Sequence, residues 1–304
     1  MHIEHFTYGV VTPLLAYTLS VLGSLAGLVA TAKARGMADS GRRARWLLLA
    51  AFAIGGTGIW VMHFVAMLGF SVVGTPVRYD LTITFASWLL AVIVVAIGLF
   101  IVGFGRPNAF KVIAAGVLTG VGVAGMHYTG MYAMRTSAAV TYDRDLVIAS
   151  LVIAVVAATV ALWFTVTLRR GVAIFVAALI MGVAVSGMHY TGMYALRMTS
   201  KLAPEPISGL LPVTLIGPIG VFVLVMMLVL FGSLLKRTGD NDGGDQTYPI
   251  RPSFPQLGPQ GGGPGRPPTT AAPTTPPVKR TSAAAMIRSA QSTPPSAQPP
   301  DKRP

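Results

Sequence analysis

Three histidines in this chain stand in apolar segments at nearly equal spacing, and each is flanked by methionines. His63, His127 and His189 lie 64 and 62 residues apart. One methionine directly precedes each histidine and another follows four residues later; the six are Met62, Met126, Met188, Met67, Met131 and Met193. Imidazole nitrogen binds copper, zinc and iron, whereas thioether sulfur selects soft copper(I). The pattern predicts a histidine metal site, with copper favoured, if the three segments meet.

The surroundings of these histidines bear on that interpretation. The chain has no cysteine, so thiolate ligands and disulfides are excluded. No Lys, Arg, Asp or Glu lies within the apolar segments, and an imidazole in hydrocarbon is costly without a partner. A membrane histidine can also simply hydrogen-bond a neighbouring helix, and methionine is an ordinary filler of apolar helices. Three copies in equivalent places favour the functional interpretation.

Seven apolar stretches of about 20 residues must position these side chains, and each is long enough to cross a bilayer. A mean hydropathy of +0.66 and a charged fraction of 11% also indicate a membrane protein, since about one quarter of a soluble domain is charged. We therefore predict an all-α integral membrane protein in a lipid bilayer. The predicted spans are 8–30, 46–69, 83–104, 112–134, 146–168, 172–196 and 213–235.

The net charge of +13 is distributed in the way that membrane insertion produces. Alternate loops hold eleven basic residues against one acid, whereas the other loops hold five of each. This asymmetry is the positive-inside pattern, and it argues against a nucleic-acid surface. We expect the N-terminus outside and the C-terminus in the cytoplasm of a multi-pass cell-membrane protein. The first seven residues contain no Lys or Arg, so a cleavable signal peptide is not expected.

The three motifs also define an internal repeat of two helices, with the motif on the second helix of each pair. A period of two helices restores the orientation, so parallel repeats are related by an axis along the membrane normal. Each histidine precedes the outer end of its span by six or seven residues, or about 9–10 Å. Met67, Met131 and Met193 lie one turn farther out. The prediction is three pseudo-symmetric repeats with their histidines at one level, plus a seventh helix.

Tyrosines follow the second and third histidines, but Phe64 follows the first. Tyr128 and Tyr190 can hydrogen-bond a ligand histidine from outside the metal site. Tyrosines near the ends of spans can also belong to an interfacial aromatic belt. Both interpretations remain open from sequence.

The composition changes after the seventh span. Residues 238–304 are rich in proline, glycine, serine and threonine and lack apolar periodicity. Such a segment cannot offset its ordering entropy by burial, so we predict a disordered cytoplasmic tail. The expected domains are a six-helix part at 8–200, the seventh helix at 213–235 and this tail.

The motif segments resemble a known family. Two copies match its signature and the first copy is degenerate; they are Met126-His127-Tyr128-Thr129, Met188-His189-Tyr190-Thr191 and Met62-His63-Phe64-Val65. Over residues 8–200 the chain is similar to the MHYT family of bacterial integral membrane sensor domains. The resemblance implies a copper site near the outer face. It also implies sensing of a diatomic gas such as oxygen, carbon monoxide or nitric oxide.

The leading functional prediction is a membrane signal sensor with copper as a hypothetical cofactor and no enzyme activity of its own. Many members of the resembled family carry a cyclic-dinucleotide cyclase or phosphodiesterase domain, whose signatures are missing from residues 238–304. The signal is therefore expected to pass to a cytoplasmic signalling partner. The alternative is a copper or other metal transporter or carrier in the membrane. A membrane redox enzyme is a third class, but it would need acids or a proton path within the spans.

Overall fold

The computed structural model describes residues 3–106, 108–200 and 208–239. Within these residues, seven helices are long and apolar enough to cross a membrane, which confirms the all-α membrane architecture. The second span is continuous, but its helix type changes along its length from α-helix (α2) to π-helix (η1) and back to α-helix (α3). The elements are α1 (Val11–Arg35), α2 (Ser40–Ala51), η1 (Phe52–Val61), α3 (Met62–Leu68), α4 (Leu81–Gly103), α5 (Ala109–Tyr132), α6 (Arg144–Thr167), α7 (Gly171–Tyr194), η2 (Pro212–Leu215) and α8 (Ile216–Gly239).

Several helices begin at a short polar residue whose side chain accepts a backbone N–H. Asp39, Asp80 and Asn108 do so at the starts of α2, α4 and α5, and Asp143 does so at α6. Such N-caps satisfy amide groups that have no partner inside the helix. The cap at Asp39 explains why the second span starts six residues before the apolar stretch predicted at 46–69.

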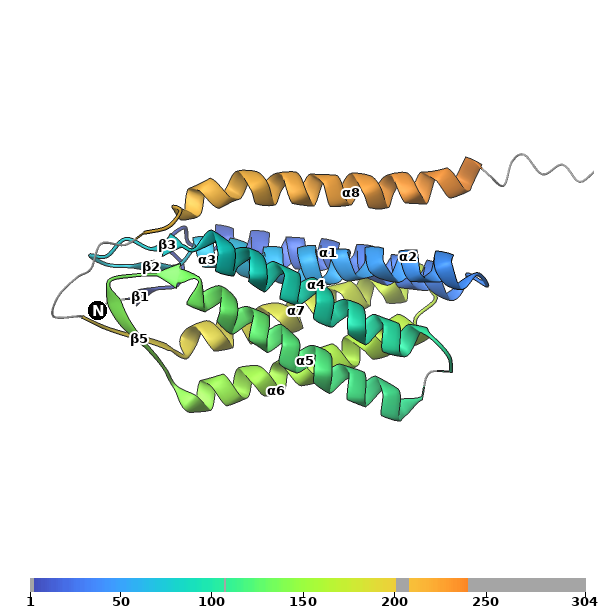
Figure 1. Cartoon of the computed structure of the whole chain (residues 1–304), viewed down its shortest axis with the longest axis horizontal. Coiled ribbons are helices and arrows are strands. Elements are labelled where there is room, and N and C mark those ends of the chain that lie inside the picture. The colour runs from blue at the N-terminus through green and yellow to red at the C-terminus, as the bar shows by residue number, and fades with distance from the viewer. Residues whose placement is uncertain (1–2, 107, 201–207, 240–304) are drawn as a thin grey trace, which may run out of the picture. The chain divides into compact units, whose positions relative to one another are not determined.

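Six of the spans form a closed ring, and the three motif helices contact one another inside it. Neighbours around the ring are α1, the second span, α4, α5, α6 and α7, and α7 packs back against α1. Figure 1 shows these helices running roughly along the long axis of the molecule, with α8 along one side. The motif helices thus alternate around the ring with α4, α6 and α1 and contact one another across its middle, as the predicted pseudo-threefold axis requires.

Helix α8, which forms the seventh span, contacts the ring mainly through the second span and its neighbour α4. Phe222 lies 5.8 Å from the ring of Trp88, and Met226 is buried with Ala53. The seventh predicted span is thus an outer helix beside the first motif helix. The tail predicted at 238–304 lies, beyond Gly239, outside the described residues.

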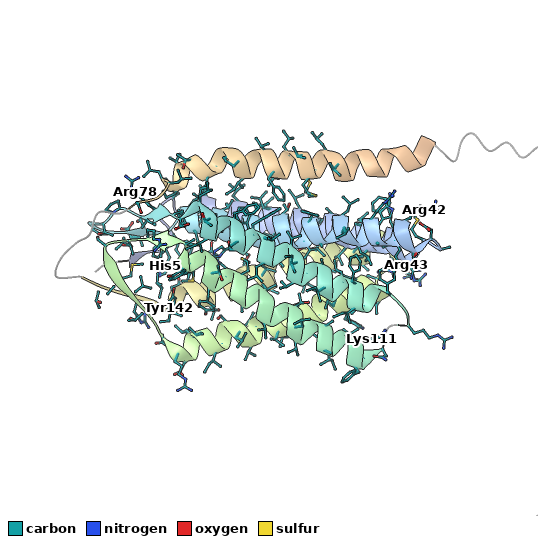
Figure 2. The ribbon with its side chains drawn as sticks, viewed as in Figure 1. His5, Arg42, Arg43, Arg78, Lys111 and Tyr142 are labelled. Atoms are coloured by element: carbon teal, nitrogen blue, oxygen red, sulfur yellow. The ribbon has the colours of Figure 1, made fainter. Side chains whose placement is uncertain are left out.

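Short antiparallel strand pairs occupy one end of the bundle, and the hydropathy pattern did not predict them. The pairs are β1 (Ile3–Glu4) with β2 (Ser71–Val72), β3 (Arg78–Tyr79) with β4 (Met134–Arg135), and β5 (Ala138–Tyr142) with β6 (Leu196–Ser200). We call this the strand end; His5, Arg78 and Tyr142 lie there in Figure 2. Arg42, Arg43 and Lys111 mark the opposite end, which we call the basic end.

The strands are joined by ion pairs to the helix caps. Arg135 contacts Asp80 at 3.0 Å and Arg197 contacts Asp143 at 3.3 Å. Each arginine lies in the strand that follows a motif helix, Arg135 after α5 and Arg197 after α7. Each aspartate is the N-cap of the helix that precedes that motif helix, Asp80 for α4 and Asp143 for α6. The arrangement repeats between α5 and α4 and between α7 and α6, so the pseudo-symmetry extends into the loops.

Candidate metal centre

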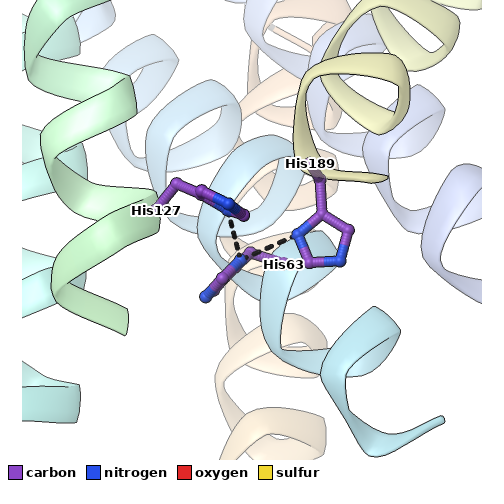
Figure 3. Close-up of side chains that lie close together, drawn as sticks. All are labelled: His63, His127 and His189. Atoms are coloured by element: carbon purple, nitrogen blue, oxygen red, sulfur yellow. Dashed lines mark hydrogen bonds between the residues drawn. The ribbon is translucent and has the colours of Figure 1, made fainter. Parts of the chain in front are cut away.

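The three histidines predicted as ligands meet in the interior of the bundle. His63 on α3, His127 on α5 and His189 on α7 are each at most 1% exposed. The Nδ1 atom of His63 lies 2.9 Å from that of His189 and 3.1 Å from that of His127 (Figure 3). One ring nitrogen from each of the three lies within 4.8 Å of the others. The predicted convergence is confirmed.

The three rings have nearly threefold symmetry. The ring centroid of His63 is 4.9 Å from that of His127 and 4.9 Å from that of His189, and the third separation is 5.2 Å. The interplanar angles are 75°, 80° and 89°. Each imidazole therefore presents its edge to the next one, and the Nδ1 atoms of all three rings are directed toward a shared space.

The three imidazoles use only part of their hydrogen-bonding capacity within the cluster. A neutral imidazole has one N–H and one lone pair. His63 Nδ1 is close to two other Nδ1 atoms, while the Nε2 atoms of all three rings are buried and have no described partner. If each proton is on Nε2, three lone pairs face one another. A cation among the Nδ1 atoms would balance those lone pairs, so the residues fit a metal ion.

The donors offer a metal three neutral nitrogens. Among the described residues, the cluster contains no carboxylate beside the histidines. Metal–imidazole bonds are about 2.0–2.1 Å long, so nitrogens that share a metal are about 3.5 Å apart. The observed 2.9 and 3.1 Å separations require only a small opening of the cluster.

Two glycines that the sequence analysis did not identify as site residues make room for the imidazoles. A Cβ added to Gly130 would clash with Nε2 of His63, and one added to Gly192 would clash with Nε2 of His127. Each glycine lies three residues after the histidine of its own motif and faces the histidine of another. The spacing His-x-x-Gly was a visible signal, but its meaning depends on the packing of different helices.

The residue after each histidine presents an aromatic ring edge to the imidazole. Phe64, Tyr128 and Tyr190 each lie 5.0 Å from the ring of the preceding histidine, at 76–89°. Since phenylalanine makes this contact as well as tyrosine, the contact does not need the hydroxyl.

The two tyrosine hydroxyls lie in different environments. Tyr128 shares a hydrogen bond with Ser150 Oγ on α6 at 2.6 Å. Tyr190 Oη is buried and has no described partner, and its ring contacts Phe6. A hydrogen bond from either tyrosine to a ligand histidine therefore stays a prediction.

The six predicted methionines lie on the same helices as the histidines, and all are at most 2% exposed; they are Met62, Met67, Met126, Met131, Met188 and Met193. Their burial fits both predicted alternatives, metal assistance and packing. Thioether coordination stays a prediction.

An apolar cavity of about 50 Å³ lies on the basic-end side of the histidines. Ile59, Val123 and Val185 line it, and each lies four residues before the histidine of its helix. Met188 also contributes to its wall. Three related positions one helical turn from the histidines place this cavity along the same axis as the cluster.

The N-terminal segment covers the strand-end side of α7. The His5 ring lies 4.7 Å from that of Tyr194 and 5.8 Å from that of Phe70. Partial burial lowers the pKa of His5 from its ordinary value. This imidazole lies outside the spans and outside the three-histidine cluster.

Comparison with known proteins identifies the repeats. A family model described as "Bacterial signalling protein N terminal repeat", MHYT, matches residues 56–116, 120–178 and 182–239. Each matched segment begins seven residues before a motif histidine. It pairs the motif helix with the following helix, so the predicted pairing of the motif helix with the preceding one is not the frame of the family repeat. In this frame α8 completes the third repeat.

Three curated relatives are similar to this chain over about a quarter of their own length. A bifunctional diguanylate cyclase/cyclic di-GMP phosphodiesterase, MucR of Pseudomonas aeruginosa, is 43% identical over 56% of the chain and 24% of the relative. The cyclic di-GMP phosphodiesterase NbdA of the same species is 36% identical over 65% and 25%. The signaling protein YkoW of Bacillus subtilis is 28% identical over 66% and 25%. The chain thus spans about a quarter of these relatives. No solved structure matches it significantly.

Proposed function

Because the chain belongs to the MHYT family of bacterial signalling proteins, we propose that it is a membrane sensor that binds copper through His63, His127 and His189. The seven spans make it a multi-pass membrane protein, and the matched repeats are homologous to the membrane sensor domains of signalling proteins. The metal and the signal are the parts that we propose.

The observation that carries the metal proposal is the convergence of three buried imidazole nitrogens on one space. Buried polar atoms are normally paired, and with their protons on Nε2 the three imidazoles would offer three Nδ1 lone pairs to a cation. Copper is favoured over zinc because six buried methionines lie on the same helices as the histidines and thioethers prefer copper(I). Bound copper would supply an open coordination position for a small ligand.

The apolar cavity beside the cluster supports a diatomic gas as that ligand. Its volume of about 50 Å³ has room for a small molecule. Apolar cavities of this kind exclude water and accept apolar guests, and such gases dissolve in the bilayer interior. We propose oxygen, carbon monoxide or nitric oxide as the ligand, reaching the histidines past Ile59, Val123 and Val185.

The distribution of charge supports an orientation. Basic residues gather at the basic end, where Arg42, Arg43 and Lys111 lie (Figure 2), and such an excess is typical of cytoplasmic loops. On this basis we propose that the N-terminus lies outside, the C-terminus lies in the cytoplasm and the histidines lie nearer the outer face. The signal would then pass to a cytoplasmic partner.

The same cavity walls argue against a metal carrier. A carrier would need ligands that continue toward the basic end along the motif helices. The positions one turn from the histidines are Ile59, Val123 and Val185, which offer no ligand atom. Met181 and Met188 are the thioethers in the cavity wall, and both lie on α7, whereas a carrier pathway would favour ligands on all three motif helices.

Metal analysis of the purified full chain tests the proposal. We expect copper in about one equivalent in the wild type and none in the double variant His127→Ala/His189→Ala, while His5→Ala keeps its copper as the matched control. Equal, negligible copper in all three after loading with copper(I) would remove the metal proposal. A copper-loaded protein whose absorption spectrum does not change when any of the three gases is added would contradict the gas proposal alone. Copper uptake into vesicles would favour the carrier.

A further inference from the structure

A second cavity lies at the basic end, far from the histidines, and arginines from three parts of the chain line it. Its volume is about 230 Å³. Arg35 comes from the end of α1, Arg43 from the start of α2, and Arg169 follows α6. Among the described residues, no carboxylate lines this cavity. Three guanidinium groups thus share a partly enclosed space without a compensating acid.

The donors of two of these arginines are only partly used. Arg35 donates from Nη2 to the carbonyl of Leu168, while its Nη1 is buried and has no described partner. Arg43 donates from Nη2 to the carbonyl of Met37 at 2.9 Å, while its Nε is also buried and without a described partner. These carbonyl contacts hold the side chains in place, so the unused N–H groups are fixed donors.

Electrostatics give the empty space a preference for anions. Arg169 lies close enough to Arg35 for their charges to repel. Arg43 also lies over the ring of Phe104, 5.9 Å from its centroid, which fixes its plane. Asp39 is the acid near these helices in sequence, but it pairs with exposed Arg42 at 3.6 Å. Like charges with unused buried donors are unfavourable alone and favourable around an anion.

We propose that this cavity binds a phosphate group. Phosphate offers several acceptor oxygens to guanidinium groups that approach from different sides, and arginine recognises it bidentately. The volume admits a phosphate with part of the molecule that carries it. Basic pockets between membrane helices can bind anionic lipid head groups, and a soluble phosphorylated compound offers the same chemistry. The site is separate from the metal centre and does not depend on the proposed copper.

Native mass spectrometry of the full chain in detergent tests this, with phosphatidylglycerol, phosphatidylcholine and inorganic phosphate as probes. We expect saturable binding of phosphatidylglycerol or inorganic phosphate, and a loss of about tenfold or more in Arg35→Gln/Arg43→Gln. The control Arg42→Gln/Arg45→Gln removes the same charge from exposed positions and should bind as the wild type does. Saturable binding of inorganic phosphate without binding of phosphatidylglycerol would identify a soluble phosphate source, and binding of phosphatidylglycerol that inorganic phosphate does not displace would identify a lipid.

Two outcomes would overturn the proposal. One is that no probe binds saturably; the other is that both double variants lose binding equally, which would mean general charge attraction. Because Arg35 also holds the Leu168 carbonyl, its variant can fail to fold. Arg43→Gln and exposed Arg169→Gln, tested singly, then decide: unchanged binding in both contradicts the site.

Discussion

The first motif helix and the two that follow it deliver equivalent histidines from different backbones. The span that carries the first motif, which is the second of the chain, passes through the π-helical segment η1 immediately before His63, whereas α5 and α7 are regular α-helices. Most residues in the apolar stretch of this second span are buried, against fewer than half in the apolar stretch of α5 and a third in that of α7. Yet the three imidazoles have nearly equal separations. The position of the histidine is maintained although the path of the chain to it differs.

The first and second repeats also differ in the residue that hydrogen-bonds an equivalent serine of the following helix, and each repeat makes one such bond. In the second repeat the Tyr128 hydroxyl pairs with Ser150 on the following helix. In the first repeat the equivalent serine, Ser87, accepts a hydrogen bond from the indole of Trp60 at 3.0 Å. Phe64 therefore needs no hydroxyl. The degenerate motif is a different solution to the same packing, and its histidine is as central as the others.

The largest effect should come from removing any one histidine, and the degenerate repeat should respond as strongly as the others. His63→Ala is expected to weaken copper binding at least as much as His127→Ala. Each loss should exceed the about 10–100-fold typical of an outer-shell partner, because a ligand nitrogen is lost. Copper titration of the purified variants measures this. Retained binding in His63→Ala alone would show that the first repeat does not contribute a ligand.

The motif glycines give the next largest effect and distinguish the repeats directly. Gly130→Ala and Gly192→Ala place a methyl group against Nε2 of His63 and His127, so a ring must rotate out of the cluster. We expect copper affinity to fall about tenfold or more. The equivalent position in the first repeat is already alanine, so Ala66→Gly should leave copper binding nearly unchanged. Comparable losses in all three variants would contradict this account.

The sequence predicted those features of the molecule that depend on neighbouring residues along the chain, and it did not predict those that depend on contacts between distant segments. Seven apolar stretches and the 64- and 62-residue spacings predicted the spans and one histidine level, because hydropathy and helix rise are local properties. The π-helical turn η1 was not predicted. There Gly58 and Gly23 let the second span approach α1, a close contact between distant segments.

The site itself divides in the same way. Histidine identity and depth were readable, but the use of Nδ1 at the centre and the facing of Gly130 toward His63 depend on ring orientation and helix rotation. The arginine cavity was also not predicted, because the count of charges assigned each loop to a side of the membrane and did not show which arginines lie together. The strand pairs were missed because their segments are short and lie far apart in sequence.

A smaller effect is expected from the two hydrogen bonds to the repeat-related serines. Tyr128→Phe removes a half-buried interhelical bond, and such bonds in membrane proteins contribute about 0.6 kcal/mol on average and up to about 1.7. Trp60→Phe should cost more, since Trp60 is only 8% exposed and the change also removes packed volume. Thermal unfolding in detergent measures both. Copper content should not change, and a loss of copper in Tyr128→Phe would instead support a role for its hydroxyl at the metal site.

The smallest effect concerns the loop ion pair of the first repeats and appears only in acid. The backbone N–H of Ile83 and then Arg135 hold the pKa of Asp80 below its ordinary value of 3.8. A lowered pKa means that the folded protein is stabilised at pH values above that ordinary value, and that this stabilisation is lost as pH falls through the folded pKa. Asp80→Asn keeps a residue that can cap α4 but removes the titration. The variant should therefore show a smaller drop in unfolding temperature than the wild type between neutral pH and pH 3. Asp145→Asn, which changes an exposed acid at the start of α6, serves as the control. An Asp80 variant with the full acid sensitivity of the wild type would show that this carboxylate does not couple the loops to the fold.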